Sequence, residues 1–174
     1  MALDFAYSGG FDERWESLHE PADLAGWLAS RFPEVDGGVN DRDLTDAKAM
    51  RASLARMALA ASRNEPPAAS DVDIINLFAA TPDIPPALAG GSRRAGRSNA
   101  RAGQALAAMA REAVELFAED KQERIRECAA VDCGLVFYDE SRSNNRRWCS
   151  MHRCGNRAKV RAHRERTAAA GVGA

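Results

Sequence analysis

The sequence of 174 residues has few aromatic side chains and no long apolar run. Aromatic residues make up 6% of the chain, and no stretch approaches the ~20 consecutive apolar residues that a membrane-spanning helix requires. The first residues, Met1 to Phe5, have neither the basic start nor the apolar segment of a secretion signal. These absences argue against a membrane-embedded or exported protein, and we expect a cytoplasmic one.

Residues that favour large sheets are scarce as well. Much of the 45% hydrophobic content is alanine, which favours helices, whereas strands favour aromatic and β-branched residues. Apolar residues recur at helical intervals of three and four in four segments. These segments predict helices over residues 21–32, 44–61, 71–78 and 99–119, the last of which can run on through residues 124–126. The proline- and glycine-rich residues 81–98 predict a loop.

The fold class is therefore predicted as mainly α, with a helical N-terminal domain over residues 1–120. Thr45 or Asp43 is expected to cap the second helix, and Ser70 the third. No set of nucleophile, base and orienting group can be assembled from this domain, so no catalytic residue is predicted and we do not expect an enzyme. The residues predicted to lie in the core are Trp15, Trp27, Phe32, Met50, Val72, Ile75, Leu77, Phe78 and Phe117.

The net charge of −1 conceals two oppositely charged parts. Residues 1–120 contain 12 basic and 19 acidic side chains, a balance of −7. Residues 121–174 contain 12 basic and 6 acidic side chains, a balance of +6. Because a block of one sign often forms an interaction surface, the sequence predicts an acidic N-terminal domain followed by a basic module.

All four cysteines lie in the basic part, as two Cys-x4-Cys pairs separated by fifteen residues. A zinc ion bound by four thiolates needs sulfur atoms within about 2.3 Å of the metal, and two short chelating loops that fold back on each other supply them. Free or disulfide-bonded cysteines are the alternative, which the absence of an export signal disfavours. We predict a structural Zn²⁺ ion, since no coordination position stays open. The predicted ligands are Cys128, Cys133, Cys149 and Cys154, in preference to His152 and His163.

The residues between the two pairs predict a β-hairpin. Residues 135–138 favour a strand, residues 141–145 a turn, and residues 146–148 can form the return strand. A helix is expected to follow, from Cys154 to about Thr167. This order describes a small treble-clef-like module, whose core is predicted to contain Leu135, Phe137, Trp148 and Val160.

This zinc module, residues 121–174, concentrates arginine. Basic residues recur in the expected helix at intervals of four, four and three and so share one stripe. Clustered guanidinium groups repel one another unless a polyanion such as DNA or RNA accepts their hydrogen bonds. The alternative is that they stay solvated or dock on the acidic N-terminal domain. The predicted nucleic-acid contacts are Arg142, Arg146, Arg147, Arg153, Arg157, Lys159, Arg161 and Arg164.

Several short motifs of the zinc module resemble one known family. The segments RIREC (residues 124–128), RRWCSM (146–151) and CGNRAK (154–159) occur in the order found in CGNR zinc fingers, and the likeness covers about residues 124–166. This resemblance implies a zinc-dependent finger that binds DNA. Arg157, within the CGNR tetrapeptide, is expected either to contact a phosphate or to brace the module against the N-terminal domain.

The N-terminal part is similar to the ABATE-type domain that accompanies this finger. The likeness rests on LDFA (residues 3–6), on the helix start at residues 21–24 and on the helix around residues 44–51. The family commonly continues LDFA with Asn-Thr, where this chain has Tyr7 and Ser8. The resemblance implies a stress-induced transcription regulator of bacteria.

We therefore predict a transcription regulator that binds DNA through its zinc module. An adaptor whose basic module binds an acidic protein surface is the alternative. A small-molecule effector in the N-terminal domain and a homodimer are both compatible with either role.

Overall fold

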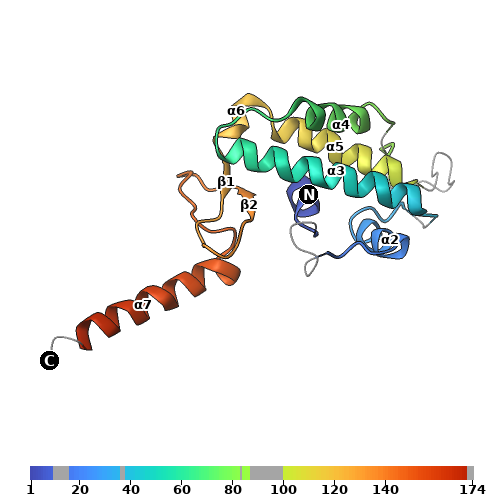
Figure 1. The fold of residues 1–174 in the computed structure, drawn as a ribbon. Coiled ribbons are helices and arrows are strands. Elements are labelled where there is room, and N and C mark those ends of the chain that lie inside the picture. The colour runs from blue at the N-terminus through green and yellow to red at the C-terminus, as the bar shows by residue number, and fades with distance from the viewer. Residues whose placement is uncertain (10–15, 36–37, 83, 87–99, 172–174) are drawn as a thin grey trace.

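The computed structural model describes residues 1–9, 16–35, 38–82, 84–86 and 100–171 of the chain (Figure 1). The predicted core residue Trp15 and most of the predicted loop 81–98 lie outside these residues. In the described part, helices dominate and two short strands pair, so the predicted mainly α fold class is confirmed.

The N-terminal domain is built from helices. The four predicted helices are present with shifted ends. An additional short helix precedes them at the start of the chain, and its five residues are too few to give a clear periodicity. A further short helix leads into the zinc module. The bounds are α1 Ala2–Ala6, α2 Pro21–Ala29, α3 Asp41–Ser62, α4 Ala69–Ala79, α5 Ala102–Leu116 and α6 Glu119–Gln122.

The helix caps differ from those predicted. The Asn40 side chain accepts hydrogen bonds from the backbone N–H groups of Arg42 and Asp43 at 2.9 and 3.1 Å. The Asp43 carboxylate in turn accepts one from the Asn40 N–H at 3.0 Å, which completes a capping box. The cap of α3 is therefore Asn40, and the prediction of Thr45 or Asp43 was wrong. The prediction of Ser70 was also wrong, because α4 starts one residue before it and has no side-chain cap.

The core of the N-terminal domain lies between α3, α5 and the helices that pack on them (Figure 1). Fully buried side chains come from α1, α2, α3 and α5, and Ile75 contributes from α4. Leu77 is 70% exposed, contrary to prediction, because it lies two residues beyond Ile75 and so on the opposite side of α4. The largest apolar side chains in this core are Phe5, Leu18, Leu24, Leu28, Met50, Leu54, Leu106 and Met109, with Trp27, Phe32, Val72, Phe78 and Phe117 packed around them.

The zinc module begins with two antiparallel strands, β1 Ile125–Glu127 and β2 Val136–Tyr138. Ile125 pairs with Tyr138 and Glu127 with Val136. The prediction of a helix through residues 124–126 and that of a return strand at 146–148 were therefore both wrong. Pairing of β1 with β2 buries Ile125 and Val136 together, which residues 146–148 could not do with charged side chains at 146 and 147.

A small apolar contact joins the zinc module to the N-terminal domain. Ile125 of β1 and Val136 of β2 pack against Ala58 of α3, and all three side chains are buried. Leu3, Tyr7, Leu59, Ala61, Leu116, Phe117 and Tyr138 surround this contact. The β strands are thereby held on the long central helix of the domain.

The last element of the described residues is a helix that projects from the molecule. A single π-helical turn, η2 (Met151–Gly155), precedes α7 (Asn156–Gly171), and the Ser150 side chain caps the start by accepting from the Arg153 N–H at 3.0 Å. The predicted C-terminal helix is thus confirmed. Figure 1 shows α7 extending away from the rest of the chain. Across the described residues we find no helix with the length and apolar character to cross a membrane.

Candidate metal centre and basic surface

Two tight loops bring the four cysteines together. Cys128 follows β1, and its N–H donates to the Leu135 carbonyl at 2.8 Å. Cys133 closes the first loop by donating to the Ala130 carbonyl at 3.0 Å, and Gly134 then adopts a φ of +64°, which glycine tolerates best. Cys149 lies two residues before η2, and Cys154 lies within it. The sequence therefore folds locally so that both pairs face one point.

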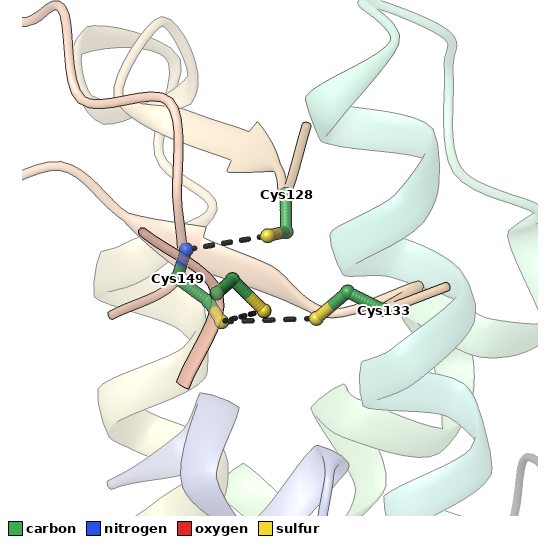
Figure 2. A group of neighbouring side chains, drawn as sticks. Cys128, Cys133 and Cys149 are labelled. Atoms are coloured by element: carbon green, nitrogen blue, oxygen red, sulfur yellow. Dashed lines mark hydrogen bonds between the residues drawn. The ribbon is translucent and has the colours of Figure 1, made fainter. Parts of the chain in front are cut away.

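The sulfur positions match a zinc site. All four Sγ atoms lie within 4.8 Å of one another. The Sγ atoms of Cys133 and Cys154 each lie 3.7 Å from that of Cys149 (Figure 2). A tetrahedral zinc ion with bonds of about 2.3 Å separates its sulfur ligands by about 3.8 Å. The cluster is therefore able to hold a zinc ion, and no other side chain is needed to complete the coordination. His152 and His163 are exposed and do not belong to the cluster.

Without a cation, the surroundings of the cluster shift the thiol pKa values in both directions. Burial raises the pKa of Cys133 and that of Cys149, and the neighbouring thiols raise the pKa of Cys149 further. Burial also acts to raise the pKa of Cys154, but a hydrogen bond from Arg157 and those from the neighbouring thiols outweigh it and lower that pKa. A bound zinc ion would stabilise the thiolates and fix the two loops to each other.

Two N–H groups point at the sulfur atoms. The Cys149 backbone N–H donates to the Cys128 Sγ at 3.4 Å (Figure 2). The Arg157 Nη2 donates to the Cys154 Sγ at 3.5 Å. Such outer hydrogen bonds offset the negative charge of four thiolates and orient them.

Arg157 also ties the first cysteine loop to the start of α7. Its Nη1 lies 2.9 Å from an Asp132 carboxylate oxygen, and its Nε donates to the Arg153 carbonyl at 3.0 Å. Arg157 does form a brace, but its partner Asp132 belongs to the zinc module, so the expected brace against the N-terminal domain was wrong. This partner lies 25 positions away along the chain, a separation at which spacing carries no sign of a contact.

Asp139 organises the segment between the cysteine pairs. Its carboxylate is fully buried and accepts hydrogen bonds from the N–H groups of Ser141 at 2.9 Å and of Arg146 at 2.8 Å. Hydrogen bonds from Ser141, the Arg146 N–H and the charge of Arg126 lower the pKa of Asp139 to about 2. Sequence reasoning missed this residue, although an Asp two positions before a Ser in a turn is a recognisable signal.

The small core of the module is only partly as predicted. Phe137 is buried beside Cys128 and Cys154, and Trp148 packs on them. Leu135 is partly buried. Val160 is 50% exposed, so its predicted place in the core was wrong. Residue 160 lies on α7 beyond the cysteines, where no second layer of described residues covers the helix.

The basic residues fall into two groups. Arg146 donates to the carbonyls of Trp148 and Cys149 and lies over the Phe137 ring, and Arg157 forms the brace described above. Arg147 lies over the Trp148 ring, 4.5 Å from its centroid, and its side chain is exposed. The others are exposed and form no ion pair with any described residue: Arg142, Arg153, Lys159, Arg161 and Arg164.

Comparison with known proteins yields two family matches. Residues 1–120 match the ABATE family model, described as "Putative stress-induced transcription regulator", and residues 124–167 match the CGNR zinc finger model. No curated protein matches the chain. The two matched segments follow each other along the chain, as the short motifs indicated.

Proposed function

The chain belongs to the ABATE family and carries a CGNR zinc finger, and on this premise we propose that it is a transcription regulator that binds duplex DNA through the exposed basic side chains of α7. In this proposal the protein acts in the bacterial cytoplasm and catalyses no reaction. The zinc site supports a structural role, because four protein sulfur atoms leave no position for a substrate.

The isolation of α7 is the observation that carries the proposal. This helix packs mainly on η2 and extends away from the N-terminal domain (Figure 1). Its charged side chains Arg161 and Arg164 are exposed and have no carboxylate partner in the described chain. A helix that is polar all round gains little from packing, so its sequence is better explained by a charged partner.

Docking of these arginines on the acidic N-terminal domain has less support. Within the described residues, no basic side chain of 141–166 forms an ion pair with a carboxylate of the N-terminal domain. Among the described residues, Arg63 of the N-terminal domain does pair with Glu127 of the zinc module, at 3.4 Å. In this ion pair the N-terminal domain provides the arginine and the zinc module provides the carboxylate. The exposed basic side chains of residues 141–166 therefore stay available to bind another molecule.

Duplex DNA fits this helix better than duplex RNA. A helix with its side chains is about 10–12 Å across and enters the B-DNA major groove, which is about 12 Å wide. The major groove of an RNA duplex is too deep and narrow for side chains to read. Arginines along one stripe can then reach the phosphates that flank the groove.

A salt titration of DNA binding tests the proposal. Full-length, zinc-loaded protein is titrated by fluorescence anisotropy against a labelled random duplex of about 20 base pairs, and four to six phosphate contacts predict a slope of log affinity against log salt of roughly −3.5 to −5.5. The double variant R161Q and R164Q is expected to make the slope less negative by about 1.8.

The matched control is R42Q, which removes an exposed arginine from the N-terminal domain. It is expected to bind DNA like the wild type. Absence of binding at low salt would instead favour the adaptor role, and tighter binding to an RNA duplex would overturn the choice of DNA. Equal binding by the wild type and the double variant would remove α7 from the interface.

A further inference from the structure

A cleft lies between the N-terminal domain and the zinc module, away from the distal part of α7. Its volume is about 820 Å³, within the roughly 300–1,000 Å³ typical of small-molecule sites, which often lie between two parts of a protein. The end of α1 and the helix α2 form one wall. The first cysteine loop, η2 and the start of α7 form the other.

Two uncompensated guanidinium groups line this cleft, one from each wall. Arg31, just after α2, lies over the Trp27 ring, 3.9 Å from its centroid, and donates to the Ser30 Oγ at 2.7 Å. Arg153 of η2 is exposed, and its side chain forms no described contact. Neither arginine has a carboxylate partner in the part of the chain that the structure describes.

The carboxylates in the lining do not neutralise these two arginines. Asp132 is already paired with Arg157, which also lines the cleft. The Asp4 side chain is 74% exposed and lies 3.9 Å from the terminal ammonium group of Met1. Among the arginine and aspartate side chains of the lining, the three guanidinium groups therefore outnumber the two carboxylates.

The rest of the lining includes aromatic and aliphatic side chains, together with His152 and the zinc ligands Cys133 and Cys154. Tyr7, Trp27 and Leu135 contribute apolar surface. Burial raises the pKa of Tyr7 to about 12, so its phenol stays neutral at physiological pH. A site that combines guanidinium groups with apolar walls favours an anion that carries an organic group over a bare inorganic ion.

We propose that this cleft binds a small organic anion, a carboxylate or a phosphate ester, whose charged group is recognised by Arg31 and Arg153. Binding of this anion does not require that the protein bind DNA. One consequence does rest on the proposed function: Arg153 also belongs to the basic surface near α7, so a bound anion takes one cation away from DNA and weakens DNA binding.

Two simple probes test the site and separate its two candidate chemistries. Benzoate represents the carboxylate and phenyl phosphate the phosphate ester, and each is titrated into ¹⁵N-labelled full-length, zinc-loaded protein while the indole N–H signals are followed by NMR. We expect saturable binding of at least one probe, with a shift of the Trp27 signal. R31Q and R153Q are each expected to weaken that binding by about fivefold or more.

The matched controls are R42Q in the N-terminal domain and R142Q in the zinc module, both exposed and outside the cleft. They are expected to bind the probe like the wild type. The proposal is overturned if neither probe saturates, or if R31Q and R153Q bind it as tightly as the controls do. Circular dichroism confirms that each variant is folded.

The same variants distinguish a failure of the anion site from a failure of the proposed DNA binding. R31Q lies outside α7 and is expected to keep its DNA affinity while losing the probe, whereas the variant R161Q and R164Q should keep the probe while losing DNA affinity. A protein that binds the probe but no DNA retains the cleft and loses only the proposed function.

Discussion

Glu16 and Arg51 form the best-enclosed ion pair between described side chains of the N-terminal domain. The Arg51 guanidinium is 5% exposed and the Glu16 carboxylate 19% exposed, and two hydrogen bonds of 2.7 and 2.5 Å join them. The hydrogen bonds from Arg51, and those from the Leu18 and Ser17 N–H groups, outweigh burial and lower the pKa of Glu16 to about 2. Glu16 also anchors the chain just before α2 to the central helix α3.

Replacing this carboxylate is expected to destabilise the protein in a pH-dependent way. E16Q leaves a buried guanidinium without its counter-charge, which costs about 3 kcal/mol of unfolding free energy at pH 7. Because the pKa of Glu16 is lowered on folding, its contribution is full above its unfolded value of 4.5 and is lost as the pH falls toward about 2. Urea unfolding by circular dichroism should therefore show a wild-type advantage that shrinks from pH 5 to pH 3.

The control for this prediction is E115Q, which removes an exposed carboxylate from α5. It is expected to change the unfolding free energy by less than about 0.5 kcal/mol at any of these pH values. A difference between wild type and E16Q that stays constant down to pH 3 would show that the carboxylate charge contributes nothing.

The roles of some single residues could be predicted from the sequence, and those of others could not. The cysteine spacing was sufficient to propose the zinc ligands, because two short Cys-x4-Cys loops of equal length are typical of a tetrathiolate metal site. The role of Gly134 depends on a turn conformation, with a φ of +64°, that spacing does not specify. Arg157 could be assigned a brace only when Asp132, 25 positions earlier, was seen beside it.

The junction of η2 and α7 with the first cysteine loop depends on Arg157. Replacing it removes the hydrogen bond to the Cys154 Sγ and the ion pair with Asp132 together. Loss of an outer contact of this kind typically lowers metal affinity by about 10- to 100-fold. We expect R157Q to bind zinc at least about tenfold more weakly, measured by competition with a chromogenic chelator.

The control for this element is R161Q, one turn further along α7, where the side chain is exposed and forms no ion pair with a described residue. It is expected to retain zinc like the wild type while weakening DNA binding. If R157Q and R161Q hold zinc equally well, the brace does not stabilise the metal site.

The long helices and β2 were predictable in this chain, and β1 was not. The helical segments contain enough turns for apolar residues to repeat on one face, as α3 and α5 do. β1 has three residues, and a helical reading of Ile125 and its charged neighbours is equally consistent with the sequence. Its strand conformation follows from a tertiary partner, since pairing with β2 buries Ile125 and Val136 against Ala58.

The molecule as a whole contains two cores of unequal size. The large core of the N-terminal domain requires no cysteine, whereas Phe137 and the cysteines themselves form the small core of the zinc module. A module of this size buries too little apolar surface to fold alone, and structural zinc contributes on the order of 10–16 kcal/mol in comparable small fingers. Loss of zinc should therefore affect one part of the chain far more than the other.

The variant C149S tests this separation. It removes the sulfur atom that lies 3.7 Å from both Cys133 and Cys154, so we expect less than one zinc ion per chain by elemental analysis and loss of helical signal from α7. The helices of the N-terminal domain should persist and unfold in a separate transition. V131S, at a position 93% exposed in the first cysteine loop, is the control and should keep both its zinc and α7. Retention of a full zinc ion by C149S would contradict the tetrathiolate site. Unfolding of the whole chain in one step on zinc loss would contradict the separation of the two cores. It would show that the contact of Ala58 with Ile125 and Val136 makes them a single cooperative unit.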